Sequence, residues 1–175
     1  MKKLYIILFL FAAVSVRAAE IKTMKGDFTQ IREQAMFADP QESKGHFHFI
    51  ADSLLRWEYT EPASFGIIAD TKGVKLIRNG QISTENAPTP LKSMVSMIMQ
   101  IISGIDTDNT QFNVVSAKSS EGTILTLTPK KRSSQNLFIK MEITLDQTDI
   151  IARQVKMYEK SGDTTTIIFS NIKLN

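Results

Sequence analysis

The sequence predicts a mainly β protein with one or two helices, in which a curled antiparallel sheet forms an incomplete, half-open barrel covered by an apolar helix. Large apolar and polar residues alternate with a period of two along most of the chain. The connections between the alternating runs are too short for crossover helices, so neighbouring strands should be antiparallel. A sheet of roughly ten strands seldom stays flat and open.

The first 18 residues are expected to be a secretory signal peptide. Lys2 and Lys3 supply its positive start, and an apolar stretch of 13 residues follows from Leu4 to Val16. This stretch is too short to cross about 30 Å of hydrocarbon as a helix, and a small-residue cleavage site follows it at Ala18. Residues 19–175 are then expected to form a single domain.

The net charge of +3 comes from the predicted signal peptide. It holds three of the 21 basic residues and no acidic residue, so 18 basic and 18 acidic residues remain in 19–175. A chain without excess positive charge is not expected to bind nucleic acid, whose affinity depends on many phosphate contacts. There is no cysteine, so the domain must be stabilised by its core without disulfides.

The alternating runs predict strands that are separated by turn residues. Asn79-Gly80 is a strong signal for a two-residue turn, and Asp70–Gly73 is expected to be a four-residue hairpin connection. The predicted strands are Gly26–Arg32, Lys44–Ala51, Leu54–Thr60, Phe65–Ala69, Val74–Arg78, Phe112–Ala117, Thr123–Thr128, Leu137–Leu145, Ile151–Glu159 and Thr164–Ile172.

The run Leu137–Leu145 shows the alternation most clearly. Its odd-numbered residues are all apolar, whereas its even-numbered residues are polar except for Phe138. We therefore expect Ile139 to lie on the apolar face of this strand, and Phe138 to lie on the face exposed to water.

Two central runs form a hairpin with one aromatic face. Phe47 and Phe49 fall on one face of its first strand, and Leu55, Trp57 and Tyr59 fall on one face of its second strand. In a curled sheet the concave face is both core and cavity wall. These side chains are therefore candidates both for core packing and for binding an apolar ligand.

The segment 88–103 lacks strand alternation and is predicted to be a helix. Pro88 and Pro90 fit its start, and Gly104 fits its end. Apolar side chains cover about 200° of its helical wheel, which is roughly twice the width of the apolar stripe that a helix packed on one sheet needs. We expect it to be enclosed on several sides. Its methionines either fill core gaps or adapt to ligands of variable shape, and the candidate ligand-lining residues of this helix are Met94, Met97, Ile98 and Ile101.

Motifs for enzymatic chemistry are missing from the sequence. It contains no GxSxG elbow, no Gly-rich phosphate loop, no HExxH and no cysteine nucleophile. A carboxylate pair assembled by the fold is the enzymatic alternative that stays open. His46 and His48 lie two apart on one strand face, but no third histidine or cysteine completes a zinc site. We predict no enzyme, no metal and no cofactor.

Several short motifs, in this order, resemble the periplasmic carriers of outer-membrane lipoproteins, the LolA-like family. The residues that resemble the family are Phe28-Thr29-Gln30, Gly45-His46-Phe47, Leu55 to Tyr59 with Glu61-Pro62, Leu125 to Pro129, and Thr164 to Phe169 with Asn171. The chain departs from the family at Ala51-Asp52, where the family has an Arg-Pro pair associated with lid closure and cargo release.

The resemblance implies an incomplete barrel that carries lipoproteins through the periplasm, from an inner-membrane transporter to an outer-membrane acceptor. It also implies that Leu55 and Trp57 line an acyl-chain cavity in a monomeric protein. A chain of about 16 carbons costs roughly 12 kcal/mol when it is left in water. The alternatives are a carrier of another amphiphile, such as a glycolipid or a lipid-linked pigment, and an interaction domain that senses lipoproteins.

Overall fold

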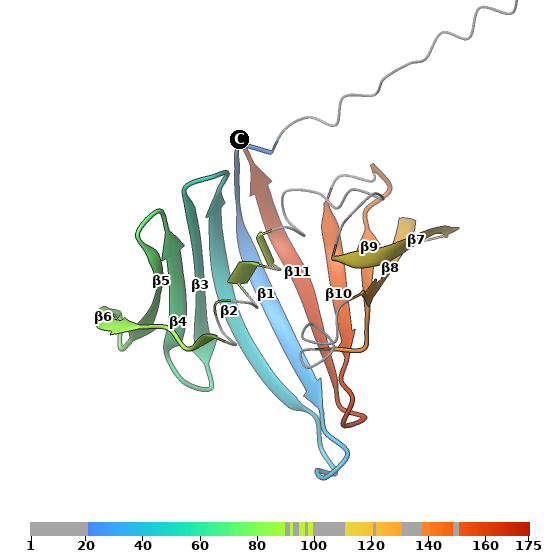
Figure 1. Ribbon diagram of the computed structural model, residues 1–175, viewed down its shortest axis with the longest axis horizontal. Helices are drawn as coiled ribbons and strands as arrows, with labels where there is room; N and C mark the ends of the chain where they lie inside the picture. Colours follow the sequence, from blue (N-terminus) through green and yellow to red (C-terminus); the bar gives the residue numbers. More distant parts are fainter. Residues whose placement is uncertain are drawn as a thin grey trace, which may run out of the picture.

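The computed structural model describes residues 21–89, 92, 95–96, 98–99, 111–120, 122–130, 138–148 and 151–175. Strands dominate these residues, which confirms the prediction of a mainly β protein (Figure 1). The strands are β1 (Thr23–Glu33), β2 (Gln41–Ile50), β3 (Leu54–Glu61), β4 (Phe65–Asp70), β5 (Gly73–Arg78), β6 (Gln81–Asn86), β7 (Phe112–Ser119), β8 (Gly122–Pro129), β9 (Lys140–Leu145), β10 (Ala152–Tyr158) and β11 (Thr164–Leu174).

All of these strands belong to one antiparallel sheet. Over the described residues it has 11 strands in the order β6-β5-β4-β3-β2-β1-β11-β10-β9-β8-β7, so the first strand of the chain pairs with the last near the middle of the sheet. The sheet is not closed, because β6 and β7 lie at its two edges. The strands fan out between the edges, and β7 runs across the direction of β1 (Figure 1).

The sequence patterns predicted every strand except β6. This strand follows the predicted turn at Asn79-Gly80, where both residues have positive φ, 51° and 75°, as a two-residue hairpin turn requires. The predicted four-residue connection at Asp70–Gly73 was wrong. Asp70 and Gly73 already pair across β4 and β5, which leaves Thr71 and Lys72 as a tighter turn.

The side chains of one sheet face form the hydrophobic core, and we call this the inner face. Its buried members come from both halves of the sheet. Central strands contribute Phe28 and Ile167, and outer strands contribute Ile67 and Leu127. The remaining buried strand residues are Met24, Phe47, Phe49, Leu55, Trp57, Ala69, Leu76, Phe112, Met141, Ile143 and Val155.

The opposite, outer face carries ion pairs. Arg56 and Glu58 pair with each other on β3, and His46 Nε2 lies 3.4 Å from Glu58 Oε2. On β9, Lys140 Nζ donates to Glu142 Oε1 at 2.9 Å. These side chains alternate with inner-face residues along the same strands. The outer face also exposes apolar residues such as Val115 and Ile168.

The start of β9 corrects one prediction. Phe138 is buried, at 1% exposure, whereas Ile139 is 45% exposed, which is the reverse of the expected alternation. The strand begins only at Lys140. The period of two does not apply to the non-strand backbone before it, and this backbone turns Phe138 inwards against Phe112, with 5.8 Å between ring centroids.

No helix can be bounded within the described residues. The residues described between 89 and 99 have helical backbone, and Lys92 N donates to Pro88 O at 3.1 Å. Val95 is buried in the core cluster of the inner face, and Ile98 and Met99 pack against it. The predicted segment therefore does contact this face.

Candidate functional site

An aromatic cluster occupies the centre of the inner face. The rings of Phe28 and Trp57 are stacked with centroids 4.0 Å apart, and Tyr59 meets the Phe28 ring edge-on at 5.1 Å. Phe47 and Phe169 extend the cluster to β2 and β11. The cluster joins four strands across the middle of the sheet, including the two that are most distant in sequence.

Glycine makes room for this packing. Gly45 lies opposite Phe28 in the pairing of β1 with β2. A Cβ atom built on Gly45 would lie 2.5 Å from Phe28 Cζ and would also run into the backbone of β3. Gly26 lies opposite Phe47, and a Cβ atom there would lie 3.1 Å from that ring. Each ring therefore lies over a neighbouring glycine.

The structure brings the hairpin candidates together as the sequence predicted. Phe47 pairs with Trp57, and Phe49 pairs with Leu55, so all four side chains lie on the inner face. They are 0–3% exposed, and Tyr59 is half-buried beside them. In the described structure they pack as core. Their predicted role as ligand lining remains a prediction.

Of the helix candidates, only Ile98 belongs to the described residues, where it is partly buried against the core. Met94, Met97 and Ile101 lie outside the described residues.

Phe28 and Phe169 belong to the cluster but were not predicted as site residues from the sequence. Phe28 was identifiable, since it lies two residues after Gly26 on the same face of the predicted strand Gly26–Arg32. Phe169 lies in a Thr-rich strand that shows no aromatic pattern of its own. Its place in the cluster follows from the pairing of β1 with β11, where it lies opposite Phe28.

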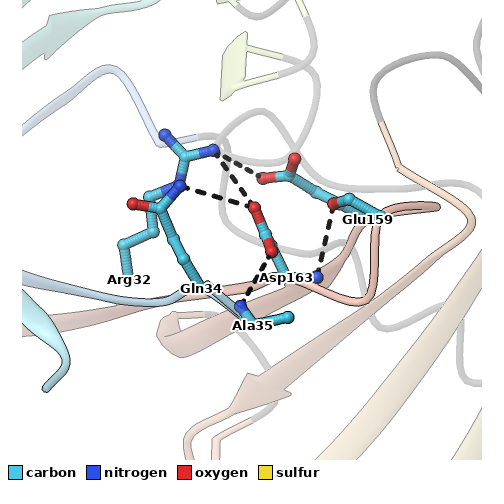
Figure 2. A network of polar contacts seen from close by, with 6 residues as sticks. Arg32, Gln34, Ala35, Glu159 and Asp163 are labelled. Atoms are coloured by element: carbon cyan, nitrogen blue, oxygen red, sulfur yellow. Dashed lines mark hydrogen bonds and ion pairs between the residues drawn. The ribbon is translucent and has the colours of Figure 1, made fainter. Parts of the chain in front are cut away.

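One end of the inner face is polar. Tyr59 Oη donates to Gln30 Oε1 at 2.8 Å, and burial raises the pKa of the Tyr59 phenol. Further along β1, Arg32 Nη2 lies 3.6 Å from Glu159 Oε1 and 3.7 Å from Asp163 Oδ2. Figure 2 shows the guanidinium facing these two carboxylates, which lie on the same side of it.

Asp163 also holds the loop that follows β1. It accepts a hydrogen bond from Ala35 N at 3.2 Å and one from Gln34 Nε2 at 3.5 Å (Figure 2). The β10–β11 turn and the β1–β2 loop are therefore tied together at this end of the sheet.

Two ion pairs of the outer face, Arg56–Glu58 and Lys140–Glu142, shift the pKa values of their carboxyl groups. The hydrogen bond from Arg56 lowers the pKa of Glu58, and the hydrogen bond from Lys140 lowers the pKa of Glu142. The described residues contain no group of three or more His, Cys, Asp or Glu that could hold a metal. Both pairs keep their charges near neutral pH.

An open antiparallel sheet with one apolar, aromatic face buried as core and ion pairs on the opposite face defines the class of this β protein. The family model for outer membrane lipoprotein carrier protein LolA matches residues 19–175. The chain belongs to this family. Its carriers are not enzymes, and this protein is accordingly not an enzyme.

Solved structures match this chain at low sequence identity. An uncharacterized conserved protein from Thermus thermophilus is 10% identical, with a TM-score of 0.52 over 88% of this chain and 79% of that one. A LolA superfamily protein from Nitrosomonas europaea is 11% identical, with a TM-score of 0.43 over 88% and 86%.

A third structure is the complex of MucA and MucB from Pseudomonas aeruginosa. It is 11% identical, with a TM-score of 0.48 over 87% of this chain. The match takes in about half, 52%, of that chain. No curated protein matches the sequence. Within the described part of the chain, no helix combines the length and hydropathy needed to cross a membrane.

Proposed function

We propose that this protein is a periplasmic carrier that shelters the acyl chains of lipoproteins against the inner face and escorts them from the inner to the outer membrane. The observation that carries the proposal is membership of the lipoprotein carrier family, together with an inner face that is apolar on both halves of the sheet. Residues 1–18 act as the signal peptide that directs export, with cleavage near Ala18.

In this proposal the sheet bends around the acyl chains as a half-open barrel. Phe47, Phe49, Leu55 and Trp57 supply dispersion contacts and exclude water, and Tyr59 marks the polar limit of the lining. The segment 88–103 covers the face and adds Met94, Met97, Ile98 and Ile101 to the lining. Val95, Ile98 and Met99 support this placement, because they already contact the inner face.

The driving force for carriage is the hydrophobic effect. Burying an acyl chain of about 16 carbons is worth roughly 12 kcal/mol relative to water, so a lipoprotein with several chains needs an escort across an aqueous compartment. The partners are then the inner-membrane transporter that releases lipoproteins and the outer-membrane acceptor. The carrier works as a monomer, without a cofactor.

Native mass spectrometry of the protein purified from its own periplasm tests this function. We expect a co-purified acylated peptide. A bound glycolipid or pigment would instead favour a carrier of another amphiphile, and a stoichiometric protein partner without lipid would favour a sensing domain. A protein that emerges empty and does not bind a fluorescent fatty-acid probe would refute the carrier.

A matched pair of variants tests whether the probe binds at the inner face. Leu55 and Val115 are both apolar strand residues, at 0% and 63% exposure. Leu55→Ala should weaken probe binding, whereas Val115→Ala should leave it unchanged. Circular dichroism at the assay temperature checks that both variants are folded. Equal binding by the two folded variants would place the site elsewhere.

A further inference from the structure

The inner face changes from apolar to polar along the strand direction. On β1 the inward residues run from Met24 and Phe28 to Gln30 and Arg32, since they alternate with a period of two. The neighbouring strand β11 changes in step, because Phe169 pairs with Phe28 and Thr165 pairs with Arg32. One end of the face is therefore apolar, and the other end presents amide, hydroxyl and charged groups.

The charges at this polar end do not balance. Arg32 contributes one positive charge, and Glu159 and Asp163 contribute two negative charges, so these three side chains carry a net charge of about −1. Both carboxylates lie more than 3.5 Å from Arg32 Nη2, which is longer than a good hydrogen bond. An additional anion at this end would be repelled by both carboxylates.

The Nε of Arg32 is buried and has no hydrogen-bond partner among the described residues. A buried N–H donor without an acceptor costs free energy that a neutral carbonyl or hydroxyl oxygen can recover. Ester and amide carbonyls of an acylated headgroup provide such an oxygen without adding charge. A phosphate also accepts hydrogen bonds, but it would bring its negative charge next to Glu159 and Asp163.

We propose that the polar end formed by Gln30, Arg32, Tyr59, Glu159 and Asp163 is a headgroup site that selects a neutral, carbonyl-bearing headgroup over an anionic one. The acyl chains then run from this end towards Phe49 and Leu55. This inference rests on the proposed carrier function and extends it, because it fixes the orientation and the headgroup class of the cargo.

Two lipids that differ only in the phosphate test the selectivity. We expect 1-oleoylglycerol to bind at least about tenfold more tightly than 1-oleoylglycerol 3-phosphate, measured by displacement of a fluorescent fatty-acid probe. Glu159→Gln should bring the two affinities closer together, because it improves binding of the phosphate lipid. Arg32→Gln should weaken binding of the neutral lipid. Glu142→Gln, on the outer face, is the control and should leave the ratio unchanged.

Two tryptophan reporters test the orientation. Trp57 is the only tryptophan of the chain, so Trp57→Phe gives a background for Tyr59→Trp at the polar end and for Phe49→Trp at the apolar end. An oleoylglycerol analogue that is brominated at its chain terminus should quench the Phe49→Trp reporter more strongly. Displacement of the fatty-acid probe first shows that each reporter variant is folded and binds.

The outcomes separate the two proposals. Equal affinity of the wild-type protein for both lipids, or a ratio that Glu159→Gln does not change, would overturn the headgroup site while leaving the carrier intact. Stronger quenching of the Tyr59→Trp reporter would overturn the orientation. Failure of the wild-type protein to bind either lipid or the fatty-acid probe would refute the carrier function itself.

Discussion

Trp57→Ala tests how much the aromatic cluster contributes to stability. Trp57 is 2% exposed, and its ring is stacked on Phe28 at 4.0 Å between centroids. Removing a buried tryptophan side chain costs about 3–5 kcal/mol. The lost stacking on Phe28 and the lost edge contact with Phe169 place the variant in the upper part of this range. In a domain of this size, a loss of about 4–5 kcal/mol should lower Tm by roughly 8–20 °C.

Urea unfolding followed by far-UV circular dichroism measures the change, because the variant has no tryptophan left for fluorescence. Val115→Ala is the matched control. Its side chain is 63% exposed, so the free energy of unfolding should change by less than about 0.5 kcal/mol. A loss below about 1 kcal/mol for Trp57→Ala, with the control unchanged, would refute the packing described for this ring.

Three further substitutions probe the sheet. Gly45→Ala places a Cβ atom 2.5 Å from Phe28 Cζ, so the free energy of unfolding in urea should fall by about 1–3 kcal/mol; an unchanged value would contradict the close approach. Tyr59→Phe removes a 2.8 Å hydrogen bond to β1 and should cost about 0.5–1.5 kcal/mol in thermal unfolding; no loss would rule this bond out. Because Arg56 lowers the pKa of Glu58 from 4.5, the wild-type protein should lose about 0.2–1 kcal/mol as pH falls from about 6 to 3. Glu58→Gln should lack this step in urea titrations, and an equal loss in both proteins would contradict the assignment.

The direction of this pH effect follows from the folded state. The carboxylate form of Glu58 accepts the hydrogen bond of Arg56, so its stabilisation is fully present above the unfolded pKa and disappears as pH falls through the lower folded pKa. Arg56 is 41% exposed, and solvent screening therefore keeps the contribution in the range of surface ion pairs.

For the central hairpin, the sequence predicted which side chains of each strand lie on the same face. The period of two fixes which residues share a face, and burial of one face fixes the register, since a slip by one residue would expose every apolar side chain. The pairs Phe47–Trp57 and Phe49–Leu55 follow from these two constraints. The same reasoning found the turn at Asn79-Gly80, where only certain residues tolerate positive φ.

Long-range pairing was not predictable in the same way. The pairing of β1 with β11 places Phe28 against Phe169, and no local pattern joins residues so far apart in the chain. The polar end of the inner face depends on this pairing, because Arg32 comes from β1 while Glu159 and Asp163 come from the turn before β11. The alternation along β9 also failed to predict the position of Phe138, because this residue lies just before the strand, outside the extended backbone to which the alternation applies.

If the protein carries acyl chains as proposed, binding to such a buried face must exchange contacts within the protein for contacts with the cargo. Phe49, Leu55 and Trp57 are at most 2% exposed, so an acyl chain gains little by covering them, and its own escape from water supplies the driving force. To reach these residues in the proposed carrier, the acyl chain must displace apolar side chains of the protein itself, and Ile98 and Met99, which pack against the core, are candidates. The net binding free energy is the gain from burying the acyl chain minus the loss from exposing the displaced side chains. It is therefore smaller than the roughly 12 kcal/mol that the acyl chain alone would gain. A carrier that must also release its cargo requires such a reduced affinity, which a face left permanently open would not provide.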